Sequence, residues 1–325
     1  MATTGTTAGQ SPSTAAGVLD HLLGCERLST DHLRRLLSRA SVIDEQLRSG
    51  SPTSGSRLLG KAVGLMFFED STRTRMSFSM AAQRGGARVV EMTGSGSSVS
   101  KGETIGDTAR VVESLGVDAL VVRARESGSA AAVADAVSVP VINAGDGKHE
   151  HPTQALIDCY ALAHATGRAG RFEFDGLKIA IVGDVVSSRV ARSAVWAMTA
   201  LGAEVTLVGP SHLAPASMEA TGAKIARNFD TLLPQLDGVM MLRVQLERHG
   251  SSTLGPVRDY KAGYALTEAR AATMKPNAVV MHPGPMNRGL EIDGAVADSD
   301  RSIVFKQTAA GVPVRLAVLA ELLGA

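Results

Sequence analysis

The chain has 325 residues, in which 33 lysines and arginines balance 32 aspartates and glutamates. This balance gives no overall attraction to nucleic acid or to an anionic membrane, so an anion site must be a local cluster. The two cysteines, Cys25 and Cys159, lie far apart in sequence, which argues against a disulfide framework or a cysteine-based zinc site and favours a reducing cytoplasm.

The length suffices for two domains of ordinary size. No stretch approaches the ~20 consecutive apolar residues of a membrane span, and the N-terminus lacks the basic-then-apolar pattern of a signal peptide. Residues 1–16 are rich in Thr, Ala, Ser and Gly, which predicts a disordered tail.

Beyond this tail, apolar runs alternate with amphipathic segments in the manner of βα repeats. A first series of strands is predicted at 62–68, 88–92, 119–122 and 139–143, and a second at 178–182, 204–208, 238–242 and 278–281. Helices are predicted at 105–115, 153–165, 189–201 and 313–323. The sequence therefore predicts an α/β protein with two doubly wound parallel-sheet domains. The helix that opens at Pro152 and runs into Gly167 is the candidate connecting element.

The segment Phe67 to Arg75, Phe-Phe-Glu-Asp-Ser-Thr-Arg-Thr-Arg, lies where the first strand-like run changes to a helical pattern. Ser71 or Thr72 is the predicted N-cap. A helix N-terminus presents unpaired N–H groups and the positive end of the helix dipole, so it suits an anion. Arg73 adds a guanidinium fork that fits phosphate or carboxylate. Taken alone, the segment also fits an ordinary capped helix with solvated arginines.

Polar side chains follow several of the later predicted strands. Arg123 follows the strand at 119–122, His151 and Gln154 follow 139–143, Arg189 follows 178–182, and Arg243 follows 238–242. Ligands of open parallel sheets sit outside the carboxyl ends of the strands, so we expect these side chains to share one site.

Two other kinds of site are disfavoured by the residue patterns. The His-Glu-His segment at 149–151 lacks the usual spacing of zinc ligands, so no metal site is expected, and either histidine alone is compatible with a structural role. Val182-Gly183-Asp184 follows a predicted strand, but no G-x-G-x-x-G motif is present there, which argues against a nucleotide-dependent dehydrogenase.

Seven sequence blocks together resemble the catalytic chains of bacterial aspartate carbamoyltransferases. They are residues 67–75, Ser-Ser-Val-Ser-Lys-Gly-Glu-Thr at 97–104, Val-Val-Arg at 121–123, His-Pro-Thr-Gln at 151–154, Gly-Asp-Val-Val-Ser-Ser-Arg-Val-Ala-Arg-Ser at 183–193, Leu-Arg-Val-Gln-Leu-Glu-Arg at 242–248, and Met-His-Pro-Gly-Pro-Met-Asn-Arg-Gly at 281–289. Each block alone is weak, but seven in the family's order and over most of the chain are highly specific.

The resemblance implies transfer of a carbamoyl group from carbamoyl phosphate to the amino group of L-aspartate, an early step of de novo pyrimidine biosynthesis. The products are N-carbamoyl-L-aspartate and phosphate. No cofactor is expected, because the substrate carries its own activated carbonyl and leaving group. The protein has to hold two anions together and stabilise the oxyanion of a tetrahedral intermediate.

The same resemblance assigns the residues that bind carbamoyl phosphate. Ser71, Thr72, Arg73 and Thr74 would hold the phosphate. Thr74, Arg123 and His151 would contact the carbamoyl oxygen, and Gln154 the carbamoyl nitrogen. Ser97 and Lys101 lie in a Gly/Ser-rich loop at 94–102, which on composition alone fits a simple linker. In the family this loop reaches the neighbouring subunit's site, where the lysine contacts both ligands, which implies a homotrimer with shared sites.

On the aspartate side, Arg189, Arg243 and Gln245 would bind the carboxylates. Pro283 and Gly284 would place backbone carbonyls near the amino group of aspartate and the carbamoyl nitrogen. Glu69, Arg189 and Arg248 resemble the charges that close the domains over the substrates. The resemblance also predicts the domain bounds: 17–152 with 306–325 for carbamoyl phosphate and 153–305 for aspartate, the final helix crossing back to the first domain.

The chain departs from the family pattern at Ser187, where His is usual, and at Ala194, where Asn is frequent. Both changes fall near the aspartate side, so affinity for aspartate or domain closure can differ. Two rival functions stay open. An ornithine carbamoyltransferase typically has His-Cys-Leu-Pro where this chain has His-Pro-Gly-Pro at 282–285, and a catalytically silent scaffold would be expected to lack ligand residues that are present here. Association with regulatory chains or with a dihydroorotase is likewise left open.

Overall fold

The computed structural model describes residues 17, 19–50, 56–93, 102–244 and 257–325. Its helices are α1 Thr30–Ser49, α2 Thr72–Arg84, α3 Ile105–Ser114, α4 Ser129–Ala134, α5 Pro152–Ala165, α6 Arg189–Ala200, α7 Val257–Tyr264, α8 Glu268–Thr273, α9 Gly294–Ala297 and α10 Val304–Leu322, with short 3₁₀ turns η3 Ala216–Thr221 and η4 Leu233–Gln235. Its strands are β1 Ala62–Phe67, β2 Arg88–Thr93, β3 Ala119–Ala124, β4 Val141–Asp146, β5 Lys178–Val182, β6 Glu204–Val208, β7 Lys224–Ala226, β8 Gly238–Met241 and β9 Val279–Met281.

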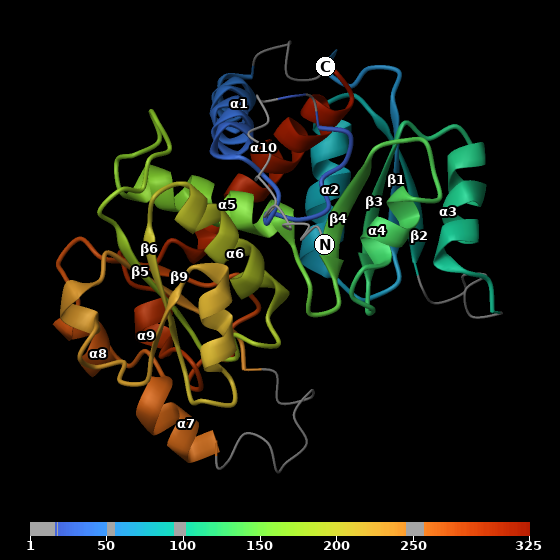
Figure 1. Cartoon of the computed structure of the whole chain (residues 1–325). Coiled ribbons are helices and arrows are strands. Elements are labelled where there is room, and N and C mark those ends of the chain that lie inside the picture. Colours follow the sequence, from blue (N-terminus) through green and yellow to red (C-terminus); the bar gives the residue numbers. More distant parts are fainter. Residues whose placement is uncertain (1–16, 18, 51–55, 94–101, 245–256) are drawn as a thin grey trace, which may run out of the picture.

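These strands form two sheets, in the orders β2-β1-β3-β4 and β7-β6-β5-β8-β9 (Figure 1). Every pairing within them is parallel, which confirms the predicted fold class of two α/β parallel-sheet units. The strand order reverses between β1 and β3 in the first sheet and between β5 and β8 in the second. Such switch points leave a crevice at the carboxyl ends of the strands, where ligands of this architecture bind.

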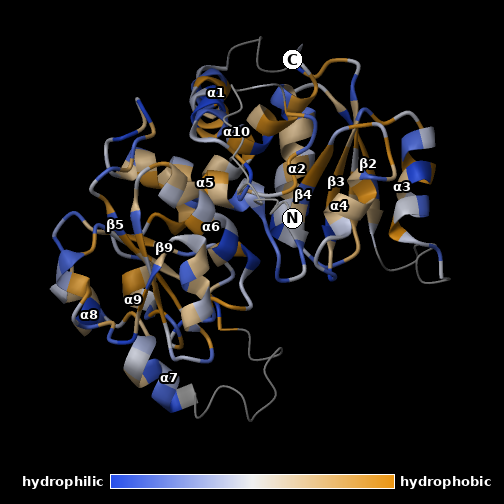
Figure 2. Cartoon of the chain, in the orientation of Figure 1, coloured by the Kyte–Doolittle hydropathy of each residue, from blue (hydrophilic) through white to orange (hydrophobic). Residues whose placement is uncertain are grey.

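The central strands β1, β3, β5 and β8 are apolar except for Lys178 at the start of β5 and Arg123 near the end of β3, because helices cover both faces of each sheet. β8 is buried at every position, and β1 is buried at every position after Ala62. A strand with both faces covered carries a continuous apolar run, whereas a half-exposed strand alternates. Figure 2 shows this concentration of apolar residues in the strands, with hydrophilic residues on the outer helices such as α3.

Helices α5 and α10 lie between the two sheets (Figure 1). α5 packs against β4 of the first sheet and against α6 and β9 of the second. α10 packs against α1, α2 and α5. Both helices are buried on nearly all sides, as expected for helices that are apolar all round. Domain boundaries at 152 and 306 stay a prediction.

Two predicted elements differ from the structure by more than two residues at one end. The last helix begins at Val304 rather than at residue 313, so that Pro313 lies inside it. Burial of this helix against three others compensates for the hydrogen bond that a proline lacks. The fourth strand runs over Val141–Asp146 rather than 139–143, because Pro140 has no N–H for the ladder.

Candidate active site

The turn between β1 and α2 is the segment for which an anion seat was predicted. β1 is buried up to Phe67, and Ser71 then becomes the N-cap of α2. The Ser71 hydroxyl makes no capping hydrogen bond, so the helix does not use it. The N–H groups of the first turn have no partner within the helix, which leaves donors for an anion. Residues 71–74 all line one large cleft in the molecule, which is called the cleft from here on.

Arg123 is placed beside this seat by the register of the first sheet. Its partner across the sheet is Phe67, and its carbonyl accepts a hydrogen bond from the N–H of Phe68 at 2.9 Å. Its Nη1 donates to the Ala144 carbonyl at 3.1 Å. The strand pairing therefore brings a guanidinium, far away in sequence, to the end of β1.

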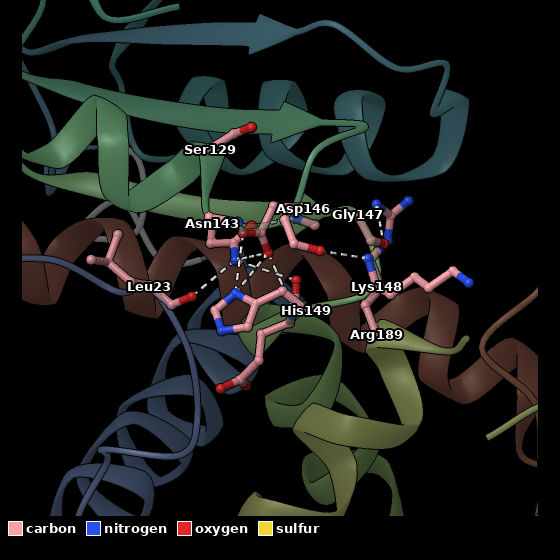
Figure 3. Close-up of polar contacts among 12 residues, drawn as sticks. Leu23, Ser129, Asn143, Asp146, Gly147, Lys148, His149 and Arg189 are labelled. Carbon is pink, nitrogen blue, oxygen red and sulfur yellow. Dashed lines mark hydrogen bonds and ion pairs between the residues drawn. The ribbon is translucent and has the colours of Figure 1, made fainter. Parts of the chain in front are cut away.

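The turn from β4 into α5 is held by a network around Asn143 and Asp146 (Figure 3). Nδ2 of Asn143 donates to Oδ1 of Asp146 at 2.7 Å and to the Leu23 carbonyl at 2.9 Å. Oδ2 of Asp146 accepts from the N–H of Gly128 at 2.7 Å. Both side chains are buried, and a satisfied buried network of this kind rigidifies the backbone that carries it. The turn ends at His151, the N-cap of α5.

His151 is buried and lines the cleft. Its backbone N–H donates to Oγ of Ser193 on α6 at 2.8 Å, while its Nδ1 is buried without a hydrogen-bond partner among the described residues. Burial, followed by the charges of Arg123, Arg315 and Arg189, lowers the pKa of His151 well below its ordinary value. The imidazole is therefore neutral at neutral pH and can donate one hydrogen bond without carrying charge.

Arg189 and Arg243 follow β5 and β8, the adjacent strands at the switch point of the second sheet. Arg189 is the first residue of α6, whose N-cap Ser188 accepts from the N–H of Ala191 at 3.1 Å. Arg243 follows β8, and β8 pairs with β5 up to Met241. Both arginines line the cleft, as the sequence predicted from their positions after strands.

The segment after β9 is fixed by His282. The N–H of Gly284 donates to Nδ1 of His282 at 2.9 Å, so the ring proton lies on Nε2, which is 3.2 Å from Oε1 of Glu291. Gly284 has a φ of +68°, and a Cβ there would be 3.5 Å from Nε of Arg73. The backbone of Gly284 therefore lies beside the side chain of Arg73.

Glu69 connects the two sides of the cleft. Its Oε2 lies 2.8 Å from Nη2 of Arg189, and its Oε1 lies 3.6 Å from Nη2 of Arg123. Nη1 of Arg189 also donates to the Gly147 carbonyl at 3.3 Å (Figure 3). The pair between Glu69 and Arg189, predicted as a domain-closure contact, is thus formed in this structure.

The predicted site residues among those described above meet in one cleft of about 1260 Å³. The predicted residues that line it are Glu69, Ser71, Thr72, Arg73, Thr74, Arg123, His151, Gln154, Arg189, Arg243, Pro283 and Gly284. A second, smaller pocket of about 480 Å³ near α3 and α4 has Glu126 as its one charged lining residue. The large cleft is therefore the candidate active site.

The remaining predictions about the site fall in two groups. Ser97, Lys101, Gln245 and Arg248 lie outside the described residues, as do residues 1–16 of the predicted tail. Of the two departures from the family pattern, Ser187 lines the cleft, and its N–H donates to Oδ1 of Asp184 at 3.3 Å. Ala194 is fully buried in the apolar core, so its methyl group serves packing.

Sequence reasoning missed a set of polar residues around the cleft, of which Ser77 is half-buried and the others are buried: Ser77, Glu150, Asp158, Ser193, Gln307 and Arg315. Oε2 of Glu150 accepts from the N–H of Cys25 at 2.6 Å and from Oγ of Ser193 at 2.7 Å, which anchors the backbone next to His151. Arg315 donates from Nη1 to Oγ of Ser77 at 2.7 Å. Charged residues inside otherwise apolar helices, as Asp158 in α5 and Arg315 in α10, were the available signal.

Within the described ranges, no group of three or more His, Cys, Asp or Glu side chains is arranged to hold a metal ion. No described helix is both long and apolar enough to cross a membrane.

Comparison with known proteins identifies the family of both halves. Residues 20–164 match the model of the aspartate/ornithine carbamoyltransferase carbamoyl-P binding domain, and residues 175–322 match that of the Asp/Orn binding domain. The aspartate carbamoyltransferase catalytic subunit of Myxococcus xanthus is 50% identical over 92% of this chain and 98% of its own length.

Solved structures show the same fold over nearly the whole chain. The aspartate transcarbamoylase of Trypanosoma cruzi in complex with N-(phosphonacetyl)-L-aspartic acid has a TM-score of 0.84 at 29% identity, covering 93% of this chain and 95% of that one. Ornithine carbamoyltransferase from Pyrococcus furiosus has a TM-score of 0.84 at 26% identity, covering 94% and 97%. The fold is thus common to both acceptor specificities, while the sequence match extends over both domains of a catalytic subunit. The chain belongs to the aspartate/ornithine carbamoyltransferase family.

Proposed function

We propose that the chain is the catalytic subunit of an aspartate carbamoyltransferase, which transfers the carbamoyl group of carbamoyl phosphate to the amino group of L-aspartate. The observation that carries this proposal is the shared cleft. On the side of the first sheet, this cleft is lined by the N-terminus of α2, which includes Arg73. On the side of the second sheet, it is lined by Arg189 and Arg243. Two separate cationic clusters suit two anionic substrates held side by side.

The phosphate occupies the N-terminus of α2 in this proposal. The free N–H groups of the first turn, the hydroxyls of Ser71, Thr72 and Thr74, and the guanidinium of Arg73 hold its oxygens. The seat binds the phosphate both as part of the substrate and as the leaving group. Its donors therefore stabilise the charge that grows on the phosphate as the C–O bond breaks.

The carbamoyl oxygen lies toward Thr74, Arg123 and His151. The amine of aspartate attacks the carbonyl carbon, and the negative charge of the tetrahedral intermediate falls on this oxygen. Arg123 supplies a positive charge, and neutral His151 supplies a hydrogen bond without a proton transfer of its own. The intermediate collapses as phosphate leaves, and the departing phosphate takes the proton that the amine releases.

Aspartate is held through its carboxylates by Arg189 and Arg243, with Gln245 as a third donor, and the carbonyls of Pro283 and Gly284 accept from its amine. These guanidinium groups would repel the cationic side chain of ornithine, which favours aspartate as the acceptor. The ion pair of Arg189 with Glu69 closes the cleft at one end and excludes water from the reaction.

We further infer that the active unit is a cytoplasmic homotrimer in which Ser97 and Lys101 reach the cleft of the neighbouring subunit. This proposal rests on the family resemblance of the Gly/Ser-rich loop at 94–102. Mixed trimers of Lys101→Ala and Arg73→Ala, each inactive alone, are expected to regain part of the activity because one site in each mixed trimer is complete. No recovery in properly mixed trimers would overturn the shared site.

The test of the proposed reaction is release of phosphate from carbamoyl phosphate by the purified chain with L-aspartate, with L-ornithine and with no acceptor. We expect release only with aspartate, matched by an equal amount of N-carbamoyl-L-aspartate. Release that depends on ornithine would overturn the assignment of the second substrate. If folded and trimeric protein releases no phosphate with either acceptor, the result would favour the alternative that the chain is a catalytically silent scaffold.

A further inference from the structure

Asp158, in the second turn of α5, is a buried carboxylate that the reaction described above does not use. Its side chain has no exposed surface. Its Oδ1 accepts two hydrogen bonds, both of 2.8 Å, from Nε2 of Gln154 and from Nε2 of Gln307. Gln154 and Gln307 both line the cleft, so the carboxylate lies directly behind the substrate site.

The hydrogen-bond pattern fixes which way the two amides point. The backbone N–H of His282 donates to Oε1 of Gln307 at 3.0 Å, so this oxygen is the accepting end and Nε2 is the donating end. Gln154 donates to the same oxygen, Oδ1, and Oδ1 can only accept from it, because a proton bound by this carboxyl group would lie on Oδ2, which has no hydrogen-bond partner among the described residues. Its Nε2 therefore turns toward Asp158, which leaves Oε1 as the end of the amide that is not bound to the carboxylate.

The same bonds connect the two substrate-binding regions. Asp158 holds Gln154 within α5 and reaches Gln307 on α10, and Gln307 holds the backbone of His282. His282 in turn accepts from the N–H of Gly284. One carboxylate oxygen is thus the common anchor of the amide on the carbamoyl side and of the backbone segment assigned to the amine of aspartate.

Nearby positive charge offsets part of the cost of burying this carboxyl group. Arg315 on α10 interacts electrostatically with Asp158, and burial lowers the pKa of this arginine to about 9, so it stays protonated at neutral pH. Its guanidinium lies 5.0 Å above the ring of Phe78 and donates to Ser77 on α2. These contacts give the network fixed positions on three helices, which is what a precise orientation of Gln154 requires.

We propose that Asp158 is a positioning residue that directs the side-chain oxygen of Gln154 at the amino group of carbamoyl phosphate and thereby selects carbamoyl over other acyl groups. The inference rests on the proposed function. Carbamoyl phosphate carries –NH₂ where acetyl phosphate carries –CH₃, and only the former can donate to an oxygen. An acetyl group would leave this acceptor without a partner, and a site built around a hydrogen bond discriminates in that way.

The test compares the two acyl phosphates in Asp158→Ala. The measured quantities are kcat/KM for carbamoyl phosphate and the inhibition constant of acetyl phosphate as a competitor, at saturating aspartate. We expect kcat/KM to fall about tenfold, the effect of losing one oriented hydrogen bond, while the inhibition constant changes less than about twofold. Asp158→Asn, whose amide oxygen can still accept from Gln154, should recover most of the discrimination.

Equal loss for both compounds, or no loss for either, would overturn the positioning role. Exposed Asp300→Ala serves as the matched control and should leave both quantities unchanged. If the alanine variant does not fold, Asp158→Thr is the second variant. Threonine has a volume similar to that of aspartate, but its side chain is one bond shorter, so its hydroxyl cannot reach Gln154. The same change in discrimination between the two acyl phosphates is expected. Absence of carbamoyl transfer in the unmodified chain would instead refute the proposed function, so the two failures are distinguishable.

Discussion

Oε2 of Glu69 lies 2.8 Å from Nη2 of Arg189, and this ion pair joins the turn after β1 to the first residue of α6. The two side chains are 16% and 9% exposed, so water screens the pair far less than it screens a surface ion pair. The same carboxylate lies 3.6 Å from Arg123. One carboxylate thus holds two guanidinium groups that we assign to different substrates.

Replacing this carboxylate should weaken the aspartate side of the site. In Glu69→Gln, Arg189 loses its charged partner, and we expect KM for aspartate to rise roughly 10- to 100-fold, corresponding to about 1.5–3 kcal/mol for a hydrogen bond to a charged group. Steady-state kinetics with varied aspartate measure the change. Glu45→Gln, an exposed glutamate on α1, is the control. An unchanged KM would show that the pair does not organise the site.

Arg73 is predicted to act mainly on turnover. If it stabilises charge on the departing phosphate, Arg73→Ala should lower kcat by roughly 10²–10³, as expected for the loss of one preorganised charged donor. Arg84→Ala, an exposed arginine at the other end of the same helix, should retain normal kcat. Circular dichroism of both variants verifies the fold. Near-normal turnover in Arg73→Ala would contradict its role at the phosphate.

Gly145 is predicted to be essential as a glycine. Its φ is +113°, and a Cβ there would lie 2.9 Å from Nη1 of Arg123 and 3.0 Å from Nε of Arg189. Gly145→Ala should therefore lower both the free energy of unfolding, by about 1–3 kcal/mol, and the turnover. In Gly170→Ala the new methyl meets nothing within 4 Å and the backbone needs no positive φ, so little change is expected. Equal thermal unfolding and turnover in the two variants would contradict this account of the turn.

The imidazole of His151 should stay neutral well below its ordinary pKa. Because the folded-state pKa is lowered, the group contributes stability that is present above about pH 6.5 and is lost as the pH falls through the folded pKa. NMR of protein labelled with ¹³C-histidine can follow the ring, and His151→Gln identifies its signal. We expect no titration of this signal between pH 8 and pH 6. A midpoint near 6.5 would contradict a neutral donor.

Asp158 should make stability depend on pH in the opposite direction. Burial raises its pKa from 3.8 to about 7, so the folded state binds this proton more tightly than the unfolded state. The resulting stabilisation is fully present below pH 3.8 and is lost as the pH rises through about 7. Between pH 6 and pH 8, the stability of the unmodified chain relative to Asp158→Asn should fall by about 1 kcal/mol in urea unfolding. An increase in the stability of the unmodified chain relative to Asp158→Asn between pH 6 and pH 8 would contradict the raised pKa of Asp158.

The fold was largely predictable because apolar runs and helix signals are local. The strand at 178–182 and the helix that begins at Arg189 match the structure, and Ser71 is the N-cap that the sequence suggested. Helix α1 was not predicted, although Ser29 caps its start and Gly50, at a φ of +69°, ends it. Its apolar stripe is interrupted by charged residues, so the signals at its two ends were more informative than its periodicity.

The site was predictable in part, for a different reason. Single residues such as Arg123 and His151 could be assigned from sequence blocks, and the structure places them in one cleft. What holds them could not be assigned, because contacts such as those of Asp158 with Gln307 and of Glu150 with Cys25 join residues more than a hundred positions apart. Such long-range polar contacts leave no local pattern in a single sequence.

The central claim is that one cleft binds a phosphate and a dicarboxylate next to each other. Calorimetric titration with N-(phosphonacetyl)-L-aspartic acid, which joins the two groups in one molecule, tests it in the unmodified chain, in Arg73→Ala and in Arg243→Ala. We expect much tighter binding than for phosphate or L-aspartate alone, weakened at least tenfold by each substitution. Binding no tighter than that of phosphate, or insensitive to either arginine, would contradict the two-substrate cleft.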